Sequence, residues 1–342
     1  MSPIRSLANF SDSDLDRAFV MAASLPDQRP MPARFLRPSH ILWRAGDWEA
    51  RRPFSDLLLD VLVVHVRDTF GIDWAREQEG LSDERRHAVF RWLQELAQEH
   101  DRAKATTTGS RVAIGGTGLI TELVWFADDL FRLRIAGALH HTLVERLRDR
   151  REFQGARYEA AVAASFVRSG FQLAWLGGSG KHGEFEATHL RTGETIVVEA
   201  KCARVRGTMN EMGEKPSEAQ LKFRAHRHYN DAVKQCPSDR PSAIFIEVTL
   251  PGAAVRLDHI PWSESARAML ASLDRGTPES PNVEFIVVLT SFGAHLAGSE
   301  IVRSWSYSVW LPKFTMNRVH QLETLACLLR GIETYGFVPP ME

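Results

Sequence analysis

Two nearly unbroken apolar segments, "SAIFIEVTL" at residues 242–250 and "VEFIVVLTSF" at residues 283–292, constrain the fold more than any other feature of the chain. Each is short and rich in β-branched and aromatic residues, without the polar alternation of a strand that has one wet face. Strands of this kind lie in the middle of a sheet that is covered on both faces. The sequence therefore predicts a sheet with helices on either side, as in an α/β protein.

The segments around these two strands predict the rest of the layer. We expect a helix at 155–170, strands at 171–175 and 304–310, a β-hairpin at 183–201, and helices at 215–236 and 315–335. The strand at 304–310, "SWSYSVW", alternates as an edge strand does. Together these segments predict a mixed β-sheet flanked by helices, which forms a C-terminal domain over residues 151–342.

The first 150 residues show helical spacing instead. Apolar residues recur at helical intervals over residues 11–23, 54–70, 81–100 and 119–151. A proline-rich stretch, "LPDQRPMPARFLRP", separates the first of these segments from the second. We therefore predict an all-helical N-terminal domain, residues 1–150, with a boundary near 145–155. Its role could be substrate selection, sensing or partner binding.

Composition excludes several classes of protein. The net charge of -1 gives no global attraction to nucleic acid or to anionic membranes, so any basic surface must be local. The three cysteines show neither a metal-binding spacing nor a disulfide framework, which fits a reducing compartment. The N-terminus lacks the apolar core of a signal peptide, and no apolar run is long enough to span a bilayer. We expect a cytoplasmic protein with no membrane partner.

The predicted hairpin, "GEFEATHLRTGETIVVEAK", carries acids where strands rarely have them. Side chains at i and i+2 share a face of a strand, so Glu184 and Glu186 point the same way, as do Glu199 and Lys201. A two-residue loop at 192–193 would place Glu186 opposite Glu199 and Glu184 opposite Lys201. Two facing carboxylates repel unless a cation lies between them, and Mg²⁺ is a natural occupant of such a site.

The helix before the hairpin adds another acid, Glu159. Its neighbours at helical spacing are Val162, Ala163 and Phe166, so the carboxylate lies along an apolar face. An unpaired buried carboxylate costs several kcal/mol. A metal ion, or Lys201, would offset that cost.

A helix glutamate, an acid on a strand, and "VEAK" at the end of the next strand resemble the PD-(D/E)xK, or restriction-endonuclease-like, nuclease superfamily. The resemblance covers roughly residues 151 to 250. It implies that Glu199 and the strand acid bind Mg²⁺, with Mn²⁺ as a substitute, and that Glu159 completes the metal shell. It also implies that Lys201 orients the attacking water and stabilises the phosphate. A "G-E-hydrophobic-D" alignment makes Glu186 the strand acid, whereas a "P-D-F" alignment chooses Glu184. The predicted register favours Glu186.

This chain departs from the superfamily pattern at the strand acid, which is normally aspartate. Both candidates here are glutamate, whose extra methylene moves the carboxylate by about 1.5 Å. Catalysis therefore depends on whether the backbone accommodates the longer side chain.

Basic residues near the hairpin are candidates for phosphate contacts. They are Lys181, in the turn that enters the hairpin, and Lys222, Arg224 and Arg227, on the predicted helix at 215–236. In the superfamily, a helix after the active hairpin commonly lies along the substrate.

The sequence thus predicts a Mg²⁺-dependent nuclease that hydrolyses phosphodiester bonds, with DNA favoured over RNA by family analogy. Restriction, phage defence and repair are all compatible roles. The alternative is a catalytically inactive nuclease-fold protein that binds nucleic acid or a protein partner. The helical N-terminal domain is the candidate surface for such a partner, and the chain could form a homodimer.

Overall fold

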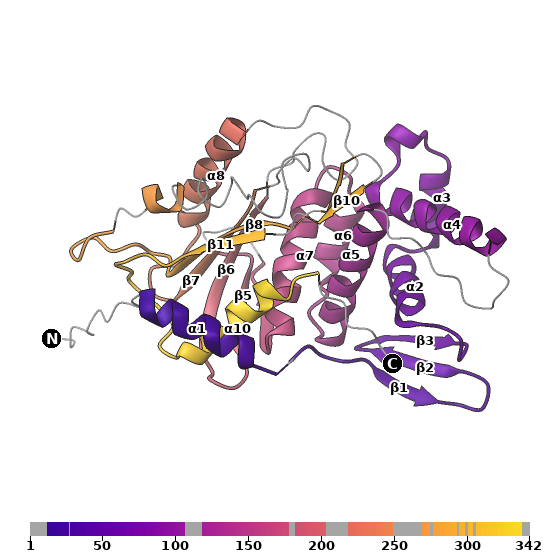
Figure 1. Ribbon diagram of the computed structural model, residues 1–342, viewed down its shortest axis with the longest axis horizontal. Helices are drawn as coiled ribbons and strands as arrows, with labels where there is room; N and C mark the ends of the chain where they lie inside the picture. Colours follow the sequence, from indigo (N-terminus) through magenta and orange to yellow (C-terminus); the bar gives the residue numbers. More distant parts are fainter. Residues whose placement is uncertain are drawn as a thin grey trace.

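A computed structural model describes residues 12–26, 28–106, 118–177, 182–202, 218–248, 269–273, 276–292, 294–297, 300–303 and 306–336. Its largest layer is a six-stranded sheet in the order β11-β8-β7-β6-β5-β4 (Figure 1). The strands are β4 (Phe171–Trp175), β5 (Phe185–His189), β6 (Thr195–Cys202), β7 (Ser242–Glu247), β8 (Ile286–Ser291) and β11 (Ser306–Trp310).

This sheet is mixed, as predicted. Strands β6, β7 and β8 run parallel, while β4, β5 and β6 form an antiparallel meander and β11 pairs antiparallel with β8. The two apolar segments become the central strands β7 and β8, and the alternating "SWSYSVW" segment supplies the edge strand β11. A separate two-stranded ribbon consists of β9 (Ala294–Ala297) and β10 (Glu300–Arg303).

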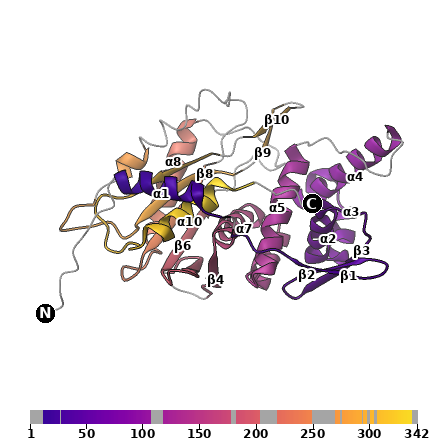
Figure 2. The ribbon, with the colours of Figure 1, turned by 60° about the horizontal axis from the view of Figure 1, so that its bottom comes forward.

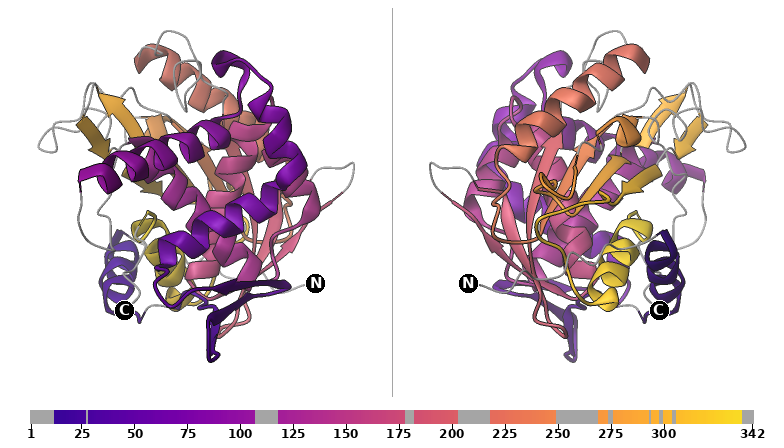
Figure 3. Two further views of the ribbon diagram at one scale, coloured as in Figure 1. Left: turned by 90° about the vertical axis from the view of Figure 1, so that its right-hand side faces the viewer. Right: turned by 90° about the vertical axis from the view of Figure 1, so that its left-hand side faces the viewer.

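Helices cover both faces of the sheet. α7 (Phe153–Arg168) and α10 (Leu322–Glu333) pack on the face that carries Val198 and Phe245, whereas α8 (Glu218–Val233) packs on the face that carries Ile244 and Ile246. Figure 3 shows α8 and α10 on opposite sides of the strands. This explains why β7 is buried at every residue but its last and is apolar from Ala243 to Ile246.

The N-terminal 150 residues contain helices and also a sheet, so the prediction of an all-helical domain is wrong. The elements here are α1 (Asp12–Ser24), β1 (Ala33–Leu36), β2 (Ile41–Ala45), β3 (Trp48–Arg52), α2 (Leu58–Phe70), α3 (Ile72–Glu79), η1 (Asp83–Arg85), α4 (Ala88–Thr106), α5 (Gly118–Ile135) and α6 (His141–Arg148).

Strands β1, β2 and β3 form an antiparallel sheet. In β2, the buried residues Ile41, Trp43 and Ala45 alternate with more exposed ones, which is the period of a strand. Gly46 takes a φ of 60° in the two-residue turn to β3, a conformation that glycine adopts readily. The proline-rich stretch before β2 hid this alternation from a reading based on helical spacing.

The hydrophobic core continues across residue 150. One cluster of buried side chains includes Trp43 and Phe126 from the N-terminal part and Phe166 and Phe245 from the C-terminal part. The turn between α6 and α7 lies within the predicted boundary region, while the division into two domains stays a prediction. None of the described helices is long and apolar enough to span a membrane.

Candidate active site

The hairpin of β5 and β6 forms with a register that differs from the predicted one. Glu186 lies opposite Val197, and not opposite Glu199. The loop contains four residues, 190–193, because the His189 N–H donates to the Glu194 carbonyl (2.9 Å) and closes the hairpin there. The predicted two-residue loop was therefore wrong, although the faces are unchanged because the pairing moves by an even number of positions.

Local hydrogen bonds explain the longer loop. The Thr192 hydroxyl lies 2.9 Å from His189 Nδ1, and Gly193 takes a φ of 71° while its N–H donates to the His189 carbonyl (2.9 Å). Glycine adopts this left-handed conformation without a steric penalty. The sequence signal for the turn was Gly193, four positions after His189. Glycine is typical of both two-residue and longer hairpin loops, so it did not determine the loop length.

The corrected register brings Glu184, in place of Glu186, to the Glu199 end of β6. The Glu184 N–H donates to the Val198 carbonyl (2.8 Å). Gly183 permits this approach, since a Cβ at that position would lie 2.6 Å from the Val198 oxygen. The preference for Glu186 over Glu184 rested on the predicted register, which the hairpin does not adopt.

Glu199 is the most deeply buried acid of the hairpin, with 1% of its surface exposed. Burial raises its pKa from 4.5 to about 7, the Lys201 ammonium lowers it, and the charges of Glu184 and Glu159 raise it further. Lys201 Nζ contacts the carboxylate, but no described group donates a well-aligned hydrogen bond to either of its oxygens. Burial of a carboxylate with so few hydrogen-bond donors makes its ionised form costly.

Lys201 lies between Glu199 and the end of α8. Besides contacting the carboxylate, its Nζ donates a hydrogen bond to Gln235 Oε1 (2.8 Å). One fifth of the side chain remains exposed, so the ammonium is accessible from solvent. Nothing in the sequence pattern indicated Gln235, which lies 34 positions further along the chain.

Glu159 on α7 is buried, as predicted, but its charge is balanced by a different group. Arg146 on α6 donates to both carboxylate oxygens (2.6 and 2.7 Å). Burial raises the pKa of Glu159 to about 7, Arg146 lowers it, and the charge of Glu184 raises it. Since Arg146 engages both oxygens, the predicted role of Glu159 as a metal ligand requires that ion pair to open.

Glu186 is also paired with an arginine. Arg240, just before β7, forms an ion pair with its carboxylate, and about a quarter of the Glu186 side chain is exposed. Glu186 therefore lies beside the start of β7, further along the strand from Glu199 than predicted.

Only some of the predicted basic residues have side chains that the structure describes. Lys181 lies outside the described residues, and Lys222 and Arg224 belong to α8, whose side chains are described only from residue 225 onward. Arg227 is exposed on α8, and its Nε lies 3.9 Å from Asp231 Oδ2. It presents positive charge to solvent on the side of the sheet that carries Lys201.

The carboxylates are not gathered as tightly as in a formed metal centre. Among the described residues, the one group of three ligand side chains whose donor atoms all lie within 4.8 Å of one another is His189, Glu323 and Cys327. The acids Glu159, Glu184 and Glu199 interact through their charges at longer range. Carboxylate oxygens are nonetheless the ligands that suit a hard divalent cation.

No family model, no curated protein and no solved structure matches this chain. The geometry of the hairpin and its neighbours is therefore what a functional argument must rest on.

Proposed function

We propose that this chain is a metal-dependent nuclease of the PD-(D/E)xK type, acting on DNA in preference to RNA, with Glu184, Glu199 and Lys201 at its active centre. The observation that carries the proposal is Glu199, a buried carboxylate whose pKa is raised to about 7 and which contacts the ammonium of Lys201, two residues along the same strand. Strongly perturbed titratable groups of this kind concentrate at functional sites.

The order of elements supports the same assignment. A helix, an antiparallel three-stranded meander, a second helix and a parallel strand follow one another as α7, β4-β5-β6, α8 and β7. The sequence pattern predicted the same order of segments and a mixed sheet flanked by helices. The acid-bearing hairpin and the helix glutamate come from the elements at which the superfamily places its site.

Charge also favours a cation at this position. Three glutamates, at 159, 184 and 199, face two cations, Arg146 and Lys201, so the group carries an excess negative charge when all are ionised. Carboxylate oxygens are the ligands that Mg²⁺ prefers, and Mn²⁺ accepts the same ones. Glu184 and Glu199 would hold the ion, because Arg146 engages both oxygens of Glu159.

Each residue then has a defined part in phosphodiester hydrolysis. A bound divalent ion would supply Lewis acidity toward the phosphate and a more acidic water. Lys201 contributes a positive charge for the phosphate oxygens, and Gln235 holds its ammonium in place. Arg146 keeps Glu159 neutralised and, with 38% of its side chain exposed, remains accessible to a phosphate.

A second candidate is a nuclease-fold protein that binds nucleic acid without cutting it. The pairs Arg146–Glu159 and Arg240–Glu186 favour this alternative, since each neutralises an acid that the superfamily pattern would offer to a metal ion. Such a protein would bind DNA equally well with and without divalent ions.

The test uses the full chain with linear, supercoiled and single-stranded DNA and with RNA, in Mg²⁺ or Mn²⁺. We expect Lys201→Met and Glu199→Gln to lower the cleavage rate by at least about 100-fold. The matched controls Lys234→Met and Glu145→Gln alter exposed side chains and should cleave at the wild-type rate.

Glu184→Gln and Glu186→Gln separate the two candidate strand acids, and we expect the larger loss from Glu184→Gln. Equal cleavage by all proteins would point to a contaminating nuclease and refute the proposal. Binding without cleavage, insensitive to the divalent ion, would establish the second candidate instead.

A further inference from the structure

We propose a second metal site in this protein, formed by His189, Glu323 and Cys327 and suited to Zn²⁺, which fastens the β5–β6 loop to α10. One donor atom from each residue lies within 4.8 Å of the others. His189 ends β5, while Glu323 and Cys327 are one turn apart on α10, so both helix side chains face the strand.

His189 supplies the feature that most strongly indicates a ligand. Its side chain is fully buried, and among the described residues Nε2 has no hydrogen-bond partner. Nδ1 lies 2.9 Å from the Thr192 hydroxyl, and the tautomer that donates this hydrogen bond leaves a lone pair on Nε2. The competing contact from the Thr192 N–H to Nδ1 is longer, at 3.3 Å. A ligating histidine is commonly held by its other nitrogen in this way.

The two helix residues add sulfur and oxygen donors. Cys327 is buried, and Glu323 is partly exposed and paired with Arg191. A carboxylate has two oxygens, so one can remain on Arg191 while the other turns to the ion. Binding would release the thiol proton of Cys327 to solvent, because the thiolate is the metal ligand.

This donor set selects for a particular class of ion. Imidazole, thiolate and carboxylate together suit Zn²⁺ and its analogue Co²⁺, whereas Mg²⁺ requires oxygen ligands. The site is therefore chemically distinct from the one at Glu184 and Glu199. It also lies near the opposite end of β5, five residues from Glu184, which is roughly 16 Å along a strand.

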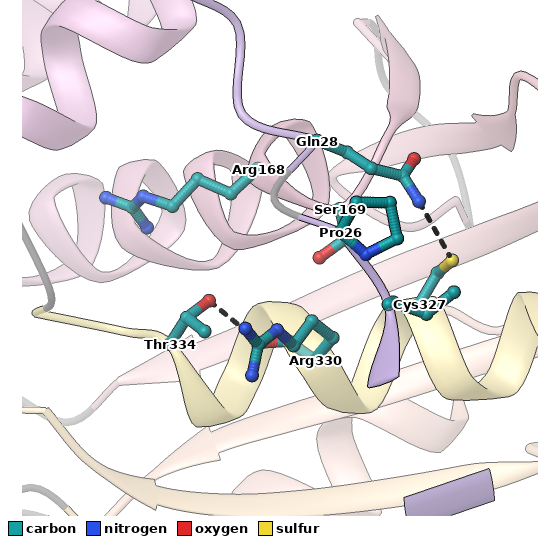
Figure 4. Close-up of a pocket in the computed structure, with 8 residues that line it drawn as sticks. Pro26, Gln28, Arg168, Ser169, Cys327, Arg330 and Thr334 are labelled. Carbon is teal, nitrogen blue, oxygen red and sulfur yellow. Dashed lines mark hydrogen bonds between the residues drawn. The ribbon is translucent and has the colours of Figure 1, made fainter. Parts of the chain in front are cut away.

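A fourth donor is close to the sulfur. Figure 4 shows Gln28, from the segment after α1, with its amide directed at Cys327, and Nε2 lies 3.7 Å from Sγ. A half-turn of the amide presents its oxygen instead, since the two ends are alike in shape. Either this oxygen or a water would complete a four-coordinate ion.

The surroundings indicate a structural role. Glu194, at the far side of the same loop, accepts hydrogen bonds from the His320 N–H and from the Thr324 hydroxyl, and Thr192 contacts Thr324 (2.8 Å). The loop is thus already seated on the N-terminal turn of α10. A metal ion would add coordinate bonds to these hydrogen bonds and so hold the hairpin loop against α10.

The experiment measures metal binding by the full-length protein without nucleic acid. Chelator-stripped protein is titrated with Co²⁺, which reports a thiolate ligand by its charge-transfer absorption, and Zn²⁺ affinity is measured by competition with a chromogenic chelator. We expect one tight site in the wild type, an affinity lowered more than about 100-fold in Cys327→Ser, and a smaller loss in Glu323→Gln. The control Cys236→Ser alters a cysteine that is partly exposed and lies outside the proposed site, and it should bind as the wild type does.

Absence of the thiolate–cobalt absorption in the wild type, or equal loss in Cys236→Ser, would overturn the proposal. Because Cys327→Ser could disturb the core, a second measurement uses the wild type alone: X-ray absorption at the zinc edge should show one sulfur ligand, and a shell of nitrogen and oxygen alone would also refute the site. Lys201→Met and Glu199→Gln should keep full Zn²⁺ affinity. The outcome is therefore independent of whether the chain is a nuclease.

Discussion

Two groups of charged side chains in this protein differ in the balance between acidic and basic residues. The first, which we call the helix network, joins α5 to α7 and consists of Glu122, Asp128, Asp129, Arg132, Arg157 and Arg168. The second, the strand cluster, consists of Glu159, Glu184 and Glu199 with Arg146 and Lys201. The helix network has as many arginines as acids, whereas the strand cluster has one acid more than its cations.

In the helix network, arginines donate hydrogen bonds directly to the acids. Arg132 Nε donates to Asp128 (2.9 Å), Arg157 donates to Glu122 (3.0 Å), and Arg168 bridges Asp128 and Asp129. All of these side chains are nearly inaccessible to solvent. The charges of this set balance, so it needs no further ion, and its contacts link the two helices.

The strand cluster is not balanced in this way, because its three acids face two cations. The Glu199 carboxylate contacts Lys201, whose side chain stays partly exposed. The comparison shows that burial of charge alone does not mark a binding site. A deficit of positive charge at a solvent-accessible position is the more informative feature.

The largest expected effect comes from breaking the helix network. Arg168→Met leaves Asp128 and Asp129 without their shared partner, so we expect a loss of about 3–5 kcal/mol in the free energy of unfolding. Urea titration followed by tryptophan fluorescence measures it. The control Arg17→Met removes an exposed ion pair on α1 and should be near neutral. A loss no larger than that of the control would show that the network is not structural.

In the strand cluster we expect a smaller effect of opposite sign: removing a charge should stabilise the protein at high pH. Burial raises the pKa of Glu199 from 4.5 to about 7, so the native state binds more protons than the unfolded chain between these values. The free energy of unfolding therefore falls as pH rises through this window, by up to on the order of 3 kcal/mol. Glu199→Gln removes that component.

Measurement of this effect requires unfolding curves for wild type and Glu199→Gln at about pH 5 and about pH 8. The variant should gain stability relative to wild type at the higher pH, while Glu145→Gln, an exposed substitution, follows the wild type. A difference between wild type and Glu199→Gln that is the same at both pH values would contradict the assignment of a raised pKa.

The smallest effect concerns an exposed charge. Arg227 is 77% exposed on α8 and pairs weakly with Asp231, so Arg227→Ala should leave the unfolding midpoint unchanged. If α8 lies along the nucleic acid, the same variant lowers the slope of log affinity against log salt by about 1. Filter binding across a salt series checks this. An unchanged slope would remove α8 from the nucleic-acid surface.

Elements with a strong periodic signal could be predicted from the sequence. The central strands β7 and β8 followed from two apolar runs, and α7 from a long helical repeat that ends at Gly170, whose φ is 81°. The small sheet of β1, β2 and β3 was missed because β1 is exposed throughout and gives no apolar run.

The site was predictable only in part, for a physical reason. Side-chain alternation gave the faces of β5 and β6 correctly, but the register depended on the hydrogen bonds of His189 and Thr192 in the loop. The partners of the acids come from other elements: Arg146 from α6 and Arg240 from the segment before β7. Ion pairs between distant positions leave no local pattern in a single sequence.

The packing of α1 against α10, drawn in Figures 1 and 2, has a consequence for how the protein is made. About 300 residues separate the two helices, so α1 is synthesised well before its partner α10 exists. At 5–20 residues per second, that delay is on the order of 15–60 s. During this time the small apolar side chains Ala18 and Ala22, fully buried in the finished fold, have no surface of α10 to cover them. The contact between α1 and α10 therefore forms only after the intervening residues have been synthesised.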